Sequence, residues 1–596
     1  MNSQASTELI VEIERCFDVN QVRYRDLTVW PLVRNAIRWQ LLYPEQNHTR
    51  LGGPPRPVPR FGVPAMQIRA LKQLRDTDFV FYTIAQNNTD RIQGRFYDRY
   101  TDPMIDLVRD RHGFLKIEMD TPPGRKKMPR YEPTLLIGPP QAAPPRPGPS
   151  RPGRIEGFGD LARTVEAVTG MVRLDEALFL QQARLVEEYR DFFLALLDCI
   201  GPKAVFFPWY YNPPAMGLTW ACRDLGAVSV EVQHGKQGRY HGMYTHWTRI
   251  PENGYPLVPD LFWNWGRDSR ANIERHRHPG VRHHRPIVGG NRWLGLWVED
   301  GGFPGSPEER AFIDSLQEHA KVVLVTLQRL PDPIPRPLIQ AVLDSPSDWF
   351  WLFRLHPLQT GQEPAFMAMM RKYGVSGFEM HMATRCPLYM LFRHTDHHVT
   401  GYSSTCFEAK AFGVPTTLIH PEALASYREY IGQGLFEYAT SGQDILAQIR
   451  RADSGEAPEH SGSYIEARRE TAIEALAAVL KRAEEIHPEK YRRVGTPGQR
   501  HPEALALAQQ GYSLLEAGRP DLARASFARA LTLEAPGPGL YYGLAQALVR
   551  TGFHQEAAEA AARELDIQPG HPGARNLLAG LLRSPEGNET RPGAAV

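Results

Sequence analysis

Short apolar runs alternate with amphipathic stretches over most of the chain. Continuous apolar runs predict buried strands at residues 78–84, 204–207, 228–233, 322–327, 350–355, 397–400 and 416–419. Helical spacing predicts helices at 30–42, 174–199 and 214–225. Strands separated by helical stretches form parallel sheets with crossover helices. The pattern therefore predicts an α/β fold with two Rossmann-like domains and a cleft between them.

The order of these elements also predicts domain boundaries. We expect a first Rossmann-like domain at residues 1–290 and a second at 291–485, because the two blocks of strands meet near residues 288–300. Residues 486–500 are rich in proline and glycine, and this composition predicts a linker.

The C-terminal part, residues 501–585, is rich in alanine and leucine and contains a repeat. A spacing of 34 relates Gly518 to Gly552, Ala523 to Ala557, Leu533 to Ile567 and Pro538 to Pro572. This period is typical of tetratricopeptide repeats, in which each repeat is a pair of helices. Two repeats are fewer than the usual minimum of about three, so we expect the block to pack on the second Rossmann-like domain or on another chain.

Composition and charge narrow the class of protein. The 596 residues are 42% hydrophobic and carry a net charge of +2, which is typical of a globular protein and gives no indication of nucleic-acid binding. The five cysteines are scattered without a CxxC pair, which argues against a zinc site and favours a reducing compartment. No signal peptide or apolar run of membrane-spanning length is evident. We therefore expect a cytoplasmic protein without a metal or other cofactor, and peripheral contact with a membrane stays open.

A histidine and a proline follow the predicted strand at 350–355. At the carboxyl end of that strand, His356 can donate a hydrogen bond to a phosphate or a pyrimidine ring, while Arg354 adds positive charge and Pro357 ends the strand. The alternative is a histidine that only caps the strand. We expect Arg354, His356 and Pro357 to belong to a nucleotide-binding site.

Hydroxyl side chains follow the next predicted strand, at 397–400. Ser403, Ser404 and Thr405 lie where a helix is expected to begin, and helix amino-termini attract phosphate groups. The same hydroxyls can cap the helix, and the two roles are compatible. Glu408, one turn further, either binds a ribose or only favours the amino end of the helix.

Gln233, His234 and Gly235 end a strand of the first domain. A glycine beside a histidine frees backbone for a ligand, so we expect Gln233 and Gly235 on the acceptor side of the cleft. Imidazole has the near-neutral pKa that a general base requires, and His234 is the candidate catalytic residue. The alternative is a structural histidine in a polar loop.

The pair His356-Pro357 and Ser403-Ser404 resembles the His-Pro and Ser-Ser motifs of bacterial GT-B glycosyltransferases that use CMP-activated sugars, namely sialyltransferases, polysialyltransferases and capsule Kdo transferases. The resemblance implies that the histidine and serines contact the cytidine nucleotide. The Gln233-His234-Gly235 string is also similar to that of capsule-synthesis proteins and CDP-glycerol glycerophosphotransferases, in which a His-Gly histidine is the proposed base.

One motif departs from the family pattern. Sialyltransferases carry an acidic-acidic-Gly motif with the base inside the first domain, whereas Glu299-Asp300-Gly301 comes too late in this chain. This favours His234 over a carboxylate as the base.

The resemblance implies a metal-independent GT-B glycosyltransferase that uses a CMP-sugar of the nonulosonic or Kdo type. The acceptor would be a protein, such as flagellin, or a capsule or lipopolysaccharide glycan, and the repeats would recruit it. Two alternatives are a CDP-glycerol-type glycerophosphotransferase and a non-catalytic scaffold with degenerate domains.

Overall fold

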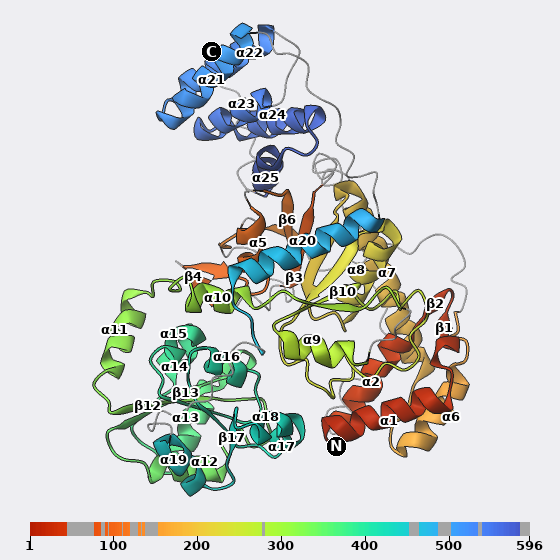
Figure 1. Cartoon of the computed structure of the whole chain (residues 1–596), viewed down its shortest axis with the longest axis vertical. Coiled ribbons are helices and arrows are strands. Elements are labelled where there is room, and N and C mark those ends of the chain that lie inside the picture. Colours follow the sequence, from red (N-terminus) through yellow and green to blue (C-terminus); the bar gives the residue numbers. More distant parts are fainter. Residues whose placement is uncertain are drawn as a thin grey trace.

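The computed structural model describes residues 1–44, 77–84, 90–92, 94–109, 111–119, 129–132, 134–137, 153–276, 281–451, 464–486, 502–533 and 539–583. Two domains built on parallel sheets lie side by side, and a stack of C-terminal helices stands on the first of them (Figure 1). Apart from Ile486, the predicted linker at 486–500 lies outside the described residues. Among the described helices, none combines the length and apolar character that a membrane crossing requires.

The first domain contains a parallel sheet in the order β11-β10-β9-β8-β3-β6-β7. Its strands are β3 (Phe79–Ile84), β6 (Phe114–Met119), β7 (Leu135–Ile137), β8 (Ala204–Pro208), β9 (Val228–Val232), β10 (Leu261–Asn264) and β11 (Arg285–Val288). Its helices are α1 (Ser3–Cys16), α2 (Trp30–Leu42), α5 (Asp102–Val108), α6 (Phe158–Thr169), α7 (Glu176–Ile200), α8 (Pro213–Leu225) and α9 (Arg267–Glu274). The short elements η1 (Val19–Gln21), β1 (Arg23–Tyr24), β2 (Leu27–Thr28), β4 (Asp90–Ile92) and β5 (Arg95–Tyr97) complete it.

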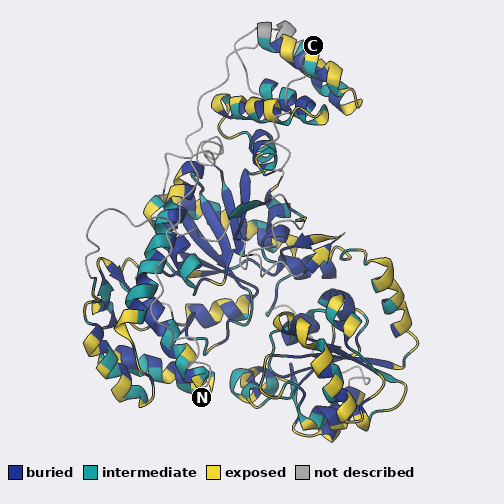
Figure 2. Cartoon of the chain, turned by 180° about the vertical axis from the view of Figure 1, so that it is seen from behind, coloured by how far each residue is buried: buried dark blue, intermediate teal, exposed yellow. Residues whose placement is uncertain are grey.

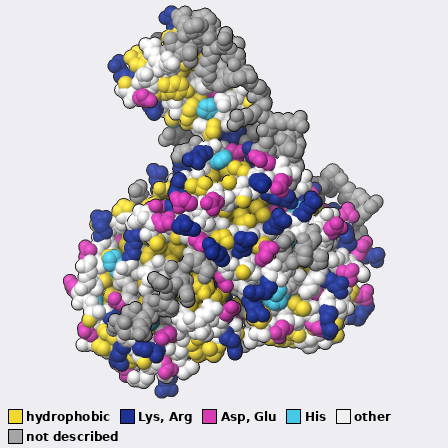
Figure 3. Space-filling model, viewed as in Figure 1, with side chains coloured by type: hydrophobic (Ala, Val, Ile, Leu, Met, Phe, Trp, Pro, Cys, Tyr) yellow, Lys and Arg dark blue, Asp and Glu magenta, His cyan; other side chains and the backbone are white. Residues whose placement is uncertain are grey.

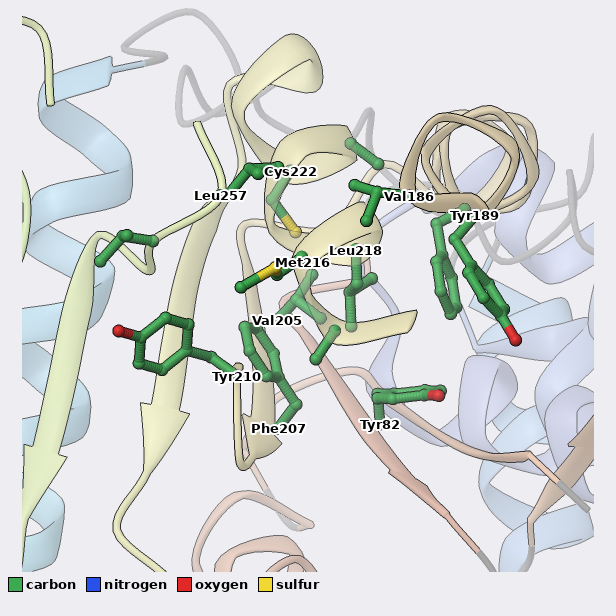
Figure 4. Packing of buried hydrophobic residues seen from close by; sticks show 14 of the residues in the cluster. Tyr82, Val186, Tyr189, Val205, Phe207, Tyr210, Met216, Leu218, Cys222 and Leu257 are labelled. Carbon is green, nitrogen blue, oxygen red and sulfur yellow. The ribbon is translucent and has the colours of Figure 1, made fainter. Parts of the chain in front are cut away.

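Helices α7 and α8 cover one face of this sheet. The side chain of Asp175 caps the start of α7, and Gly201 ends it with a φ of 64° that favours glycine. Figure 4 shows side chains of α7 and α8 pointing toward those of β8, with Tyr189, Met216 and Phe207 among them. Their burial is the main source of stability at this face.

Strand β6 was not among the predicted strands, and buried charge explains why. Lys116 and Glu118 interrupt the apolar pattern of Phe114–Met119, although every residue of the strand is buried. The Lys116 ammonium pairs with the buried carboxylate of Asp102 on α5. A charged side chain can lie in the protein interior when it is paired with an opposite charge. The strand therefore forms although its sequence lacks the continuous apolar pattern that predicts a buried strand.

The second domain contains a parallel sheet in the order β14-β13-β12-β15-β16-β17. Its strands are β12 (Lys321–Thr326), β13 (Trp349–Arg354), β14 (Phe378–Glu379), β15 (His397–Thr400), β16 (Thr416–Leu418) and β17 (Glu437–Tyr438). Its helices are α10 (Arg292–Val298), α11 (Pro307–Leu316), α12 (Arg336–Leu343), η6 (Pro357–Gln362), α13 (Glu363–Lys372), α14 (His381–Arg385), α15 (Leu388–Phe392), α16 (Thr405–Ala411), α17 (Glu422–Ser426), α18 (Arg428–Gly432) and α19 (Gly442–Arg451). Both sheets are buried, and exposed residues gather on the outer faces of the helices (Figure 2).

Two Rossmann-like domains that face a cleft are the arrangement of the GT-B fold, so the predicted fold class is confirmed. The acidic string at Glu299-Asp300 lies beside the connection between the domains. Both carboxylates pair with the buried guanidinium of Arg292. These ion pairs indicate a structural role for Glu299 and Asp300. The late position of the two residues in the sequence also argued against a catalytic role.

Helix α20 (Arg469–Ile486) departs from the predicted domain boundary at residue 485. It packs against the first sheet, where Ala472, Leu476 and Val479 share a core with Phe79 and Val230. In Figure 1 it crosses beside β3 and β10. The chain thus returns to the first domain after completing the second, because the apolar stripe of α20 packs on the sheet face that α5 also covers.

The C-terminal helices α21 (Pro502–Glu516), α22 (Pro520–Leu533), α23 (Leu540–Arg550), α24 (His554–Ile567) and α25 (Pro572–Leu581) stack in sequence. The predicted turns contain Gly518 and Gly552, both with positive φ. The helices pack on the first domain, whereas the sequence led us to expect the second domain or another chain. Helix α25 contacts β6, and Leu578 joins the apolar core that includes Ile117.

Candidate functional site

A cleft of about 1080 Å³ lies between the two domains. The carboxyl ends of β9 on one side and of β12, β13 and β15 on the other open into it. It is lined by every site residue predicted from the sequence except Gly235, namely Gln233, His234, Arg354, His356, Pro357, Ser403, Ser404, Thr405 and Glu408. The tertiary structure therefore brings the two groups of motifs to one space.

His234 stands between a carboxylate and a phenol. Its Nδ1 atom lies 3.3 Å from Oε1 of Glu231, and its Nε2 atom lies 3.2 Å from the hydroxyl of Tyr211. The first distance is that of an ion pair, and the two groups are not aligned as a hydrogen bond. Catalytic contacts often tighten only when the substrate is bound. The arrangement can hold the imidazole in one orientation.

Glu231 is itself fixed inside the first domain. The hydroxyl of Tyr244 donates to its Oε1 at 2.7 Å, and the amide of Gln237 donates to its Oε2 at 3.1 Å. The carboxylate is fully buried. A buried carboxylate with two donors keeps one position, so it can set the orientation of the neighbouring imidazole.

The loop after β9 is braced by the N-terminal helices. Arg34 of α2 donates to the carbonyls of Gly242 at 2.8 Å and of Thr245 at 3.1 Å, and it pairs with the buried Glu14 of α1. Glu14 also accepts a hydrogen bond from the backbone N–H of Thr248 at 2.8 Å. These bonds hold the loop that follows His234 against the body of the domain.

Gln233 and Gly235, predicted on the acceptor side, differ in their surroundings. Gln233 is buried, accepts from the backbone N–H of Trp265 at 2.7 Å and donates to the carbonyl of Gly235 at 2.8 Å. These bonds brace the loop. A side chain at Gly235 would meet open space, so packing alone does not require glycine there.

His356 presents one nitrogen to the cleft. Its Nδ1 atom accepts the backbone N–H of Leu358 at 3.2 Å at the start of η6, which leaves Nε2 to carry the proton. Burial and the positive charge of Arg329 lower the pKa of His356. A neutral imidazole that donates from Nε2 suits a phosphate oxygen.

Arg354 is held mainly by backbone. One guanidinium nitrogen donates to the carbonyls of Ala383 at 2.8 Å and of Cys386 at 2.5 Å at the end of α14. Burial lowers the pKa of Arg354 to about 10. The side chain lines the cleft as a cation whose position is set by helix α14, while Pro357 is exposed at its edge.

The three hydroxyls before α16 have different partners. The Ser403 hydroxyl accepts the N–H of Thr405 at 3.3 Å, and the Thr405 hydroxyl lies 3.1 Å from that of Thr326 on β12. Among the described residues, no backbone N–H of α16 donates to the Ser404 side chain. Ser404 is therefore the hydroxyl that is most available to a ligand.

Glu408 faces the first domain from α16. Burial raises the pKa of Glu408 to about 7, against the opposing effects of the Arg99 charge and a hydrogen bond from Tyr389. Arg99 in turn pairs with Asp90 at 2.8 Å. The Glu408 carboxyl therefore interacts with charged groups of the first domain across the cleft, in addition to its place on α16.

Lys236 also crosses between the domains. Its ammonium donates to the carbonyl of Ser426 and lies 3.4 Å from the centre of the Tyr427 ring. Burial lowers the pKa of Lys236 to about 7. Nearby, the hydroxyl of Tyr430 donates to Asp268 of α9. These contacts hold the two walls of the cleft together at one end.

Sequence reasoning missed Glu231, Tyr211, Lys236 and Arg99 at this site. Glu231 had a local signal, because it is an acidic residue inside the apolar run at 228–233 and lies three positions before His234. Tyr211 and Arg99 had none, since their proximity to the site is created by the packing of distant segments. Within the described ranges, no group of three or more His, Cys, Asp and Glu side chains is arranged to hold a metal ion.

No protein-family model and no curated protein matches the chain. Solved structures of low identity do match. The UDP-N-acetylglucosamine 2-epimerase of Methanocaldococcus jannaschii is 11% identical, with 67% of this chain and 99% of that one covered and a TM-score of 0.42. A wall teichoic acid polymerase is 11% identical, covering 70% and 90% with a TM-score of 0.35. A trehalose-6-phosphate synthase is 10% identical, covering 70% and 100% with a TM-score of 0.37. Likeness at this level identifies neither a substrate nor a reaction.

Proposed function

We propose that this chain is a glycosyltransferase that moves a sugar of the nonulosonic or Kdo type from a CMP-sugar to a protein or surface-glycan acceptor. The observation that carries the proposal is that His234 and His356 line one cleft from different domains. A base on one wall and a phosphate-binding imidazole on the other are what a transfer between an acceptor hydroxyl and a nucleotide sugar requires.

In the proposed reaction, Nε2 of His234 takes the proton of the acceptor hydroxyl. The hydroxyl oxygen forms a bond to the anomeric carbon of the sugar, and the bond from that carbon to the phosphate oxygen of CMP breaks. The electron pair leaves with the phosphate. Glu231 lies 3.3 Å from the imidazole and stabilises the imidazolium that forms.

The second domain would hold the leaving nucleotide. His356 would donate from Nε2 to the phosphate, the Ser404 hydroxyl would donate to the same group, and Arg354 would add positive charge. Hydrogen bonds and charge of this kind can stabilise a leaving phosphate without a metal ion. Glu408 is the proposed contact to the ribose.

We further propose that the C-terminal helices are tetratricopeptide repeats that recruit the acceptor, and that the enzyme acts in the cytoplasm. The 34-residue period and the stacked helix pairs support the first point. The absence of any disulfide among the cysteines, which all lie in described segments, is compatible with a reducing compartment.

A thermal-shift panel tests the donor. CMP or CDP should raise the melting temperature through binding to the folded state, and UDP or GDP should do so less. A preference for UDP or GDP would contradict a CMP-sugar donor. Turnover of CDP-glycerol in place of a CMP-sugar would identify the chain as a glycerophosphotransferase, the alternative that the His-Gly and His-Pro strings leave open.

Three variants test the division of roles. His356→Ala and Ser404→Ala should weaken the stabilisation by CMP. His234→Ala should leave it unchanged and lower turnover by about 10²–10⁴-fold, as the loss of a general base does. Loss of CMP binding in a folded His234→Ala protein would show that His234 belongs to the nucleotide site instead.

A further inference from the structure

The two walls of the cleft differ in charge. On the face in Figure 3, Lys and Arg side chains are interspersed with Asp and Glu, as the net charge of +2 suggests. Inside the cleft, acidic and basic side chains are distributed unequally between the two walls. Among the described lining residues, the second domain supplies both signs, with Arg329, Arg354 and Arg428 beside Glu408, Glu422 and Glu429. The first domain supplies no carboxylate there, but four cations, Arg38, Arg99, Lys236 and Arg239.

Two of the four first-domain cations already have partners. Arg99 pairs with Asp90, and Lys236 donates to the carbonyl of Ser426. For Arg38 and Arg239, the described part of the chain provides no carboxylate within ion-pair distance. Arg239 is exposed and Arg38 is partly exposed. Among the described residues, Arg38 and Arg239 are therefore cations without a carboxylate partner on the wall that carries His234.

Arg38 acts on the surroundings of His234. It contributes, after burial, to holding the pKa of His241 well below its usual range, and the ring of His241 lies 5.9 Å from that of Tyr211. Tyr211 is the phenol that contacts His234. The charge of Arg38 therefore acts on a ring that neighbours Tyr211, the residue in contact with the candidate base.

An exposed indole also neighbours His234. The Trp209 ring centre is 6.0 Å from that of His234, and the residue is 37% exposed. Its φ is 63°, a left-handed conformation that is unfavourable for a large side chain. The Nδ2 atom of Asn212 donates to its carbonyl at 2.6 Å and so supports this turn. Strained, exposed residues of this kind concentrate at ligand sites.

We propose that the first-domain surface around His234 is a subsite for an acidic glycan acceptor. In this subsite a sugar ring packs on Trp209 beside the cleft, and Arg38 and Arg239 inside the cleft meet the negative charges of the glycan. The proposal rests on the proposed function, because it names the acceptor class of that same site. A flat aromatic face packs well against the apolar face of a sugar ring, and guanidinium groups bind carboxylates in a planar fork. The indole favours a glycan over an acidic peptide as the ligand.

Binding to the full-length chain can be measured by calorimetry without any donor. The probes are an α2,8-linked sialic acid hexamer as the acidic glycan, maltohexaose as the neutral glycan and hexaglutamate as the acidic peptide. The variants are Arg38→Gln, Arg239→Gln and Trp209→Asn. Asparagine tolerates a positive φ, so the last change removes the indole while keeping a residue that suits the turn. Arg270→Gln is the matched control, since Arg270 is an exposed arginine of the same domain that does not line the cleft.

The proposal predicts that the sialic acid hexamer binds more tightly than the other two probes. Each arginine variant should weaken that binding by about tenfold, the scale of a lost charge-assisted hydrogen bond. Added salt should weaken it in the native chain and less in the variants. Trp209→Asn should weaken it as well, and Arg270→Gln should not.

Three outcomes would overturn the proposal. They are equal binding of maltohexaose, preferential binding of hexaglutamate, and failure of the hexamer to bind or to respond to the arginine variants in folded proteins. The nucleotide panel separates this result from the proposed function. If the hexamer binds but CMP does not stabilise the protein, the acceptor subsite stands and the CMP-sugar donor is excluded. If CMP stabilises the protein but the hexamer does not bind, only the acceptor subsite is excluded.

Discussion

The Nδ1 atom of His234 lies 3.3 Å from Oε1 of Glu231, three residues earlier on the same strand end. Side chains three positions apart usually point to opposite faces of a strand. Here β9 ends at Val232, and the turn that follows brings the imidazole back toward the carboxylate. The pair is therefore made by the end of the strand, where the chain leaves the pleated geometry.

Glu231→Gln should lower kcat/KM by about 10–100-fold, because the imidazolium that forms in the reaction loses a nearby negative charge. Stabilisation by CMP should not change. In a His234→Ala background the second change should have little further effect. An unchanged kcat/KM in the folded single variant would exclude Glu231 from the proposed step.

Glu14→Gln should destabilise the protein by about 3–5 kcal/mol, the cost of leaving a buried charge without its partner. The charge left behind is that of Arg34, which is fully buried and also braces the loop after β9. Chemical denaturation measures the change. Asp160→Asn, which removes an exposed ion pair with Arg163, is the control and should cost at most about 1 kcal/mol. A similar loss for both variants would contradict the importance of the buried pair.

Glu408→Gln should flatten the pH dependence of stability. Burial raises the pKa of Glu408 from its ordinary value of 4.5 to about 7. Between these two pH values the carboxyl group is protonated in the folded state and ionised in the unfolded state. The stabilising contribution is full below about pH 4.5 and is lost as the pH rises through about 7. The loss should be on the order of 3 kcal/mol. Melting temperatures across this range measure it, and the exposed Glu318→Gln is the control.

Leu578→Asp should detach the C-terminal helices from the first domain. Leu578 of α25 packs in the apolar core shared with β6, and a buried carboxylate there would be strongly unfavourable. Small-angle scattering should report a larger radius of gyration, while stabilisation by CMP stays as in the native chain. The exposed Leu582→Asp is the control. An unchanged radius for Leu578→Asp would show that other contacts hold the helices in place.

Local patterns were sufficient for much of the fold. The helix at 30–42 and the strand at 397–400 were predicted with the bounds that the structure has, since each has a continuous pattern and clear end signals. Strand β6 was missed because its buried lysine and glutamate mimic a surface segment. The docking of the C-terminal helices on the first domain was not predicted, because a period of 34 residues predicts a stack but not the surface on which it rests.

The sequence by itself determined two parallel-sheet domains, a helical C-terminal part, and the residues that meet in the cleft, because strand ends and their loop residues are encoded locally. Only the tertiary structure decided what those residues touch. Arg354 is held by the end of helix α14, and Glu408 faces Arg99 of the other domain. Trp209 lies beside His234, and Arg38 and Arg239 line the same cleft as His234. Contacts between distant segments depend on how whole elements pack, and the pattern of apolar positions within each element leaves them open.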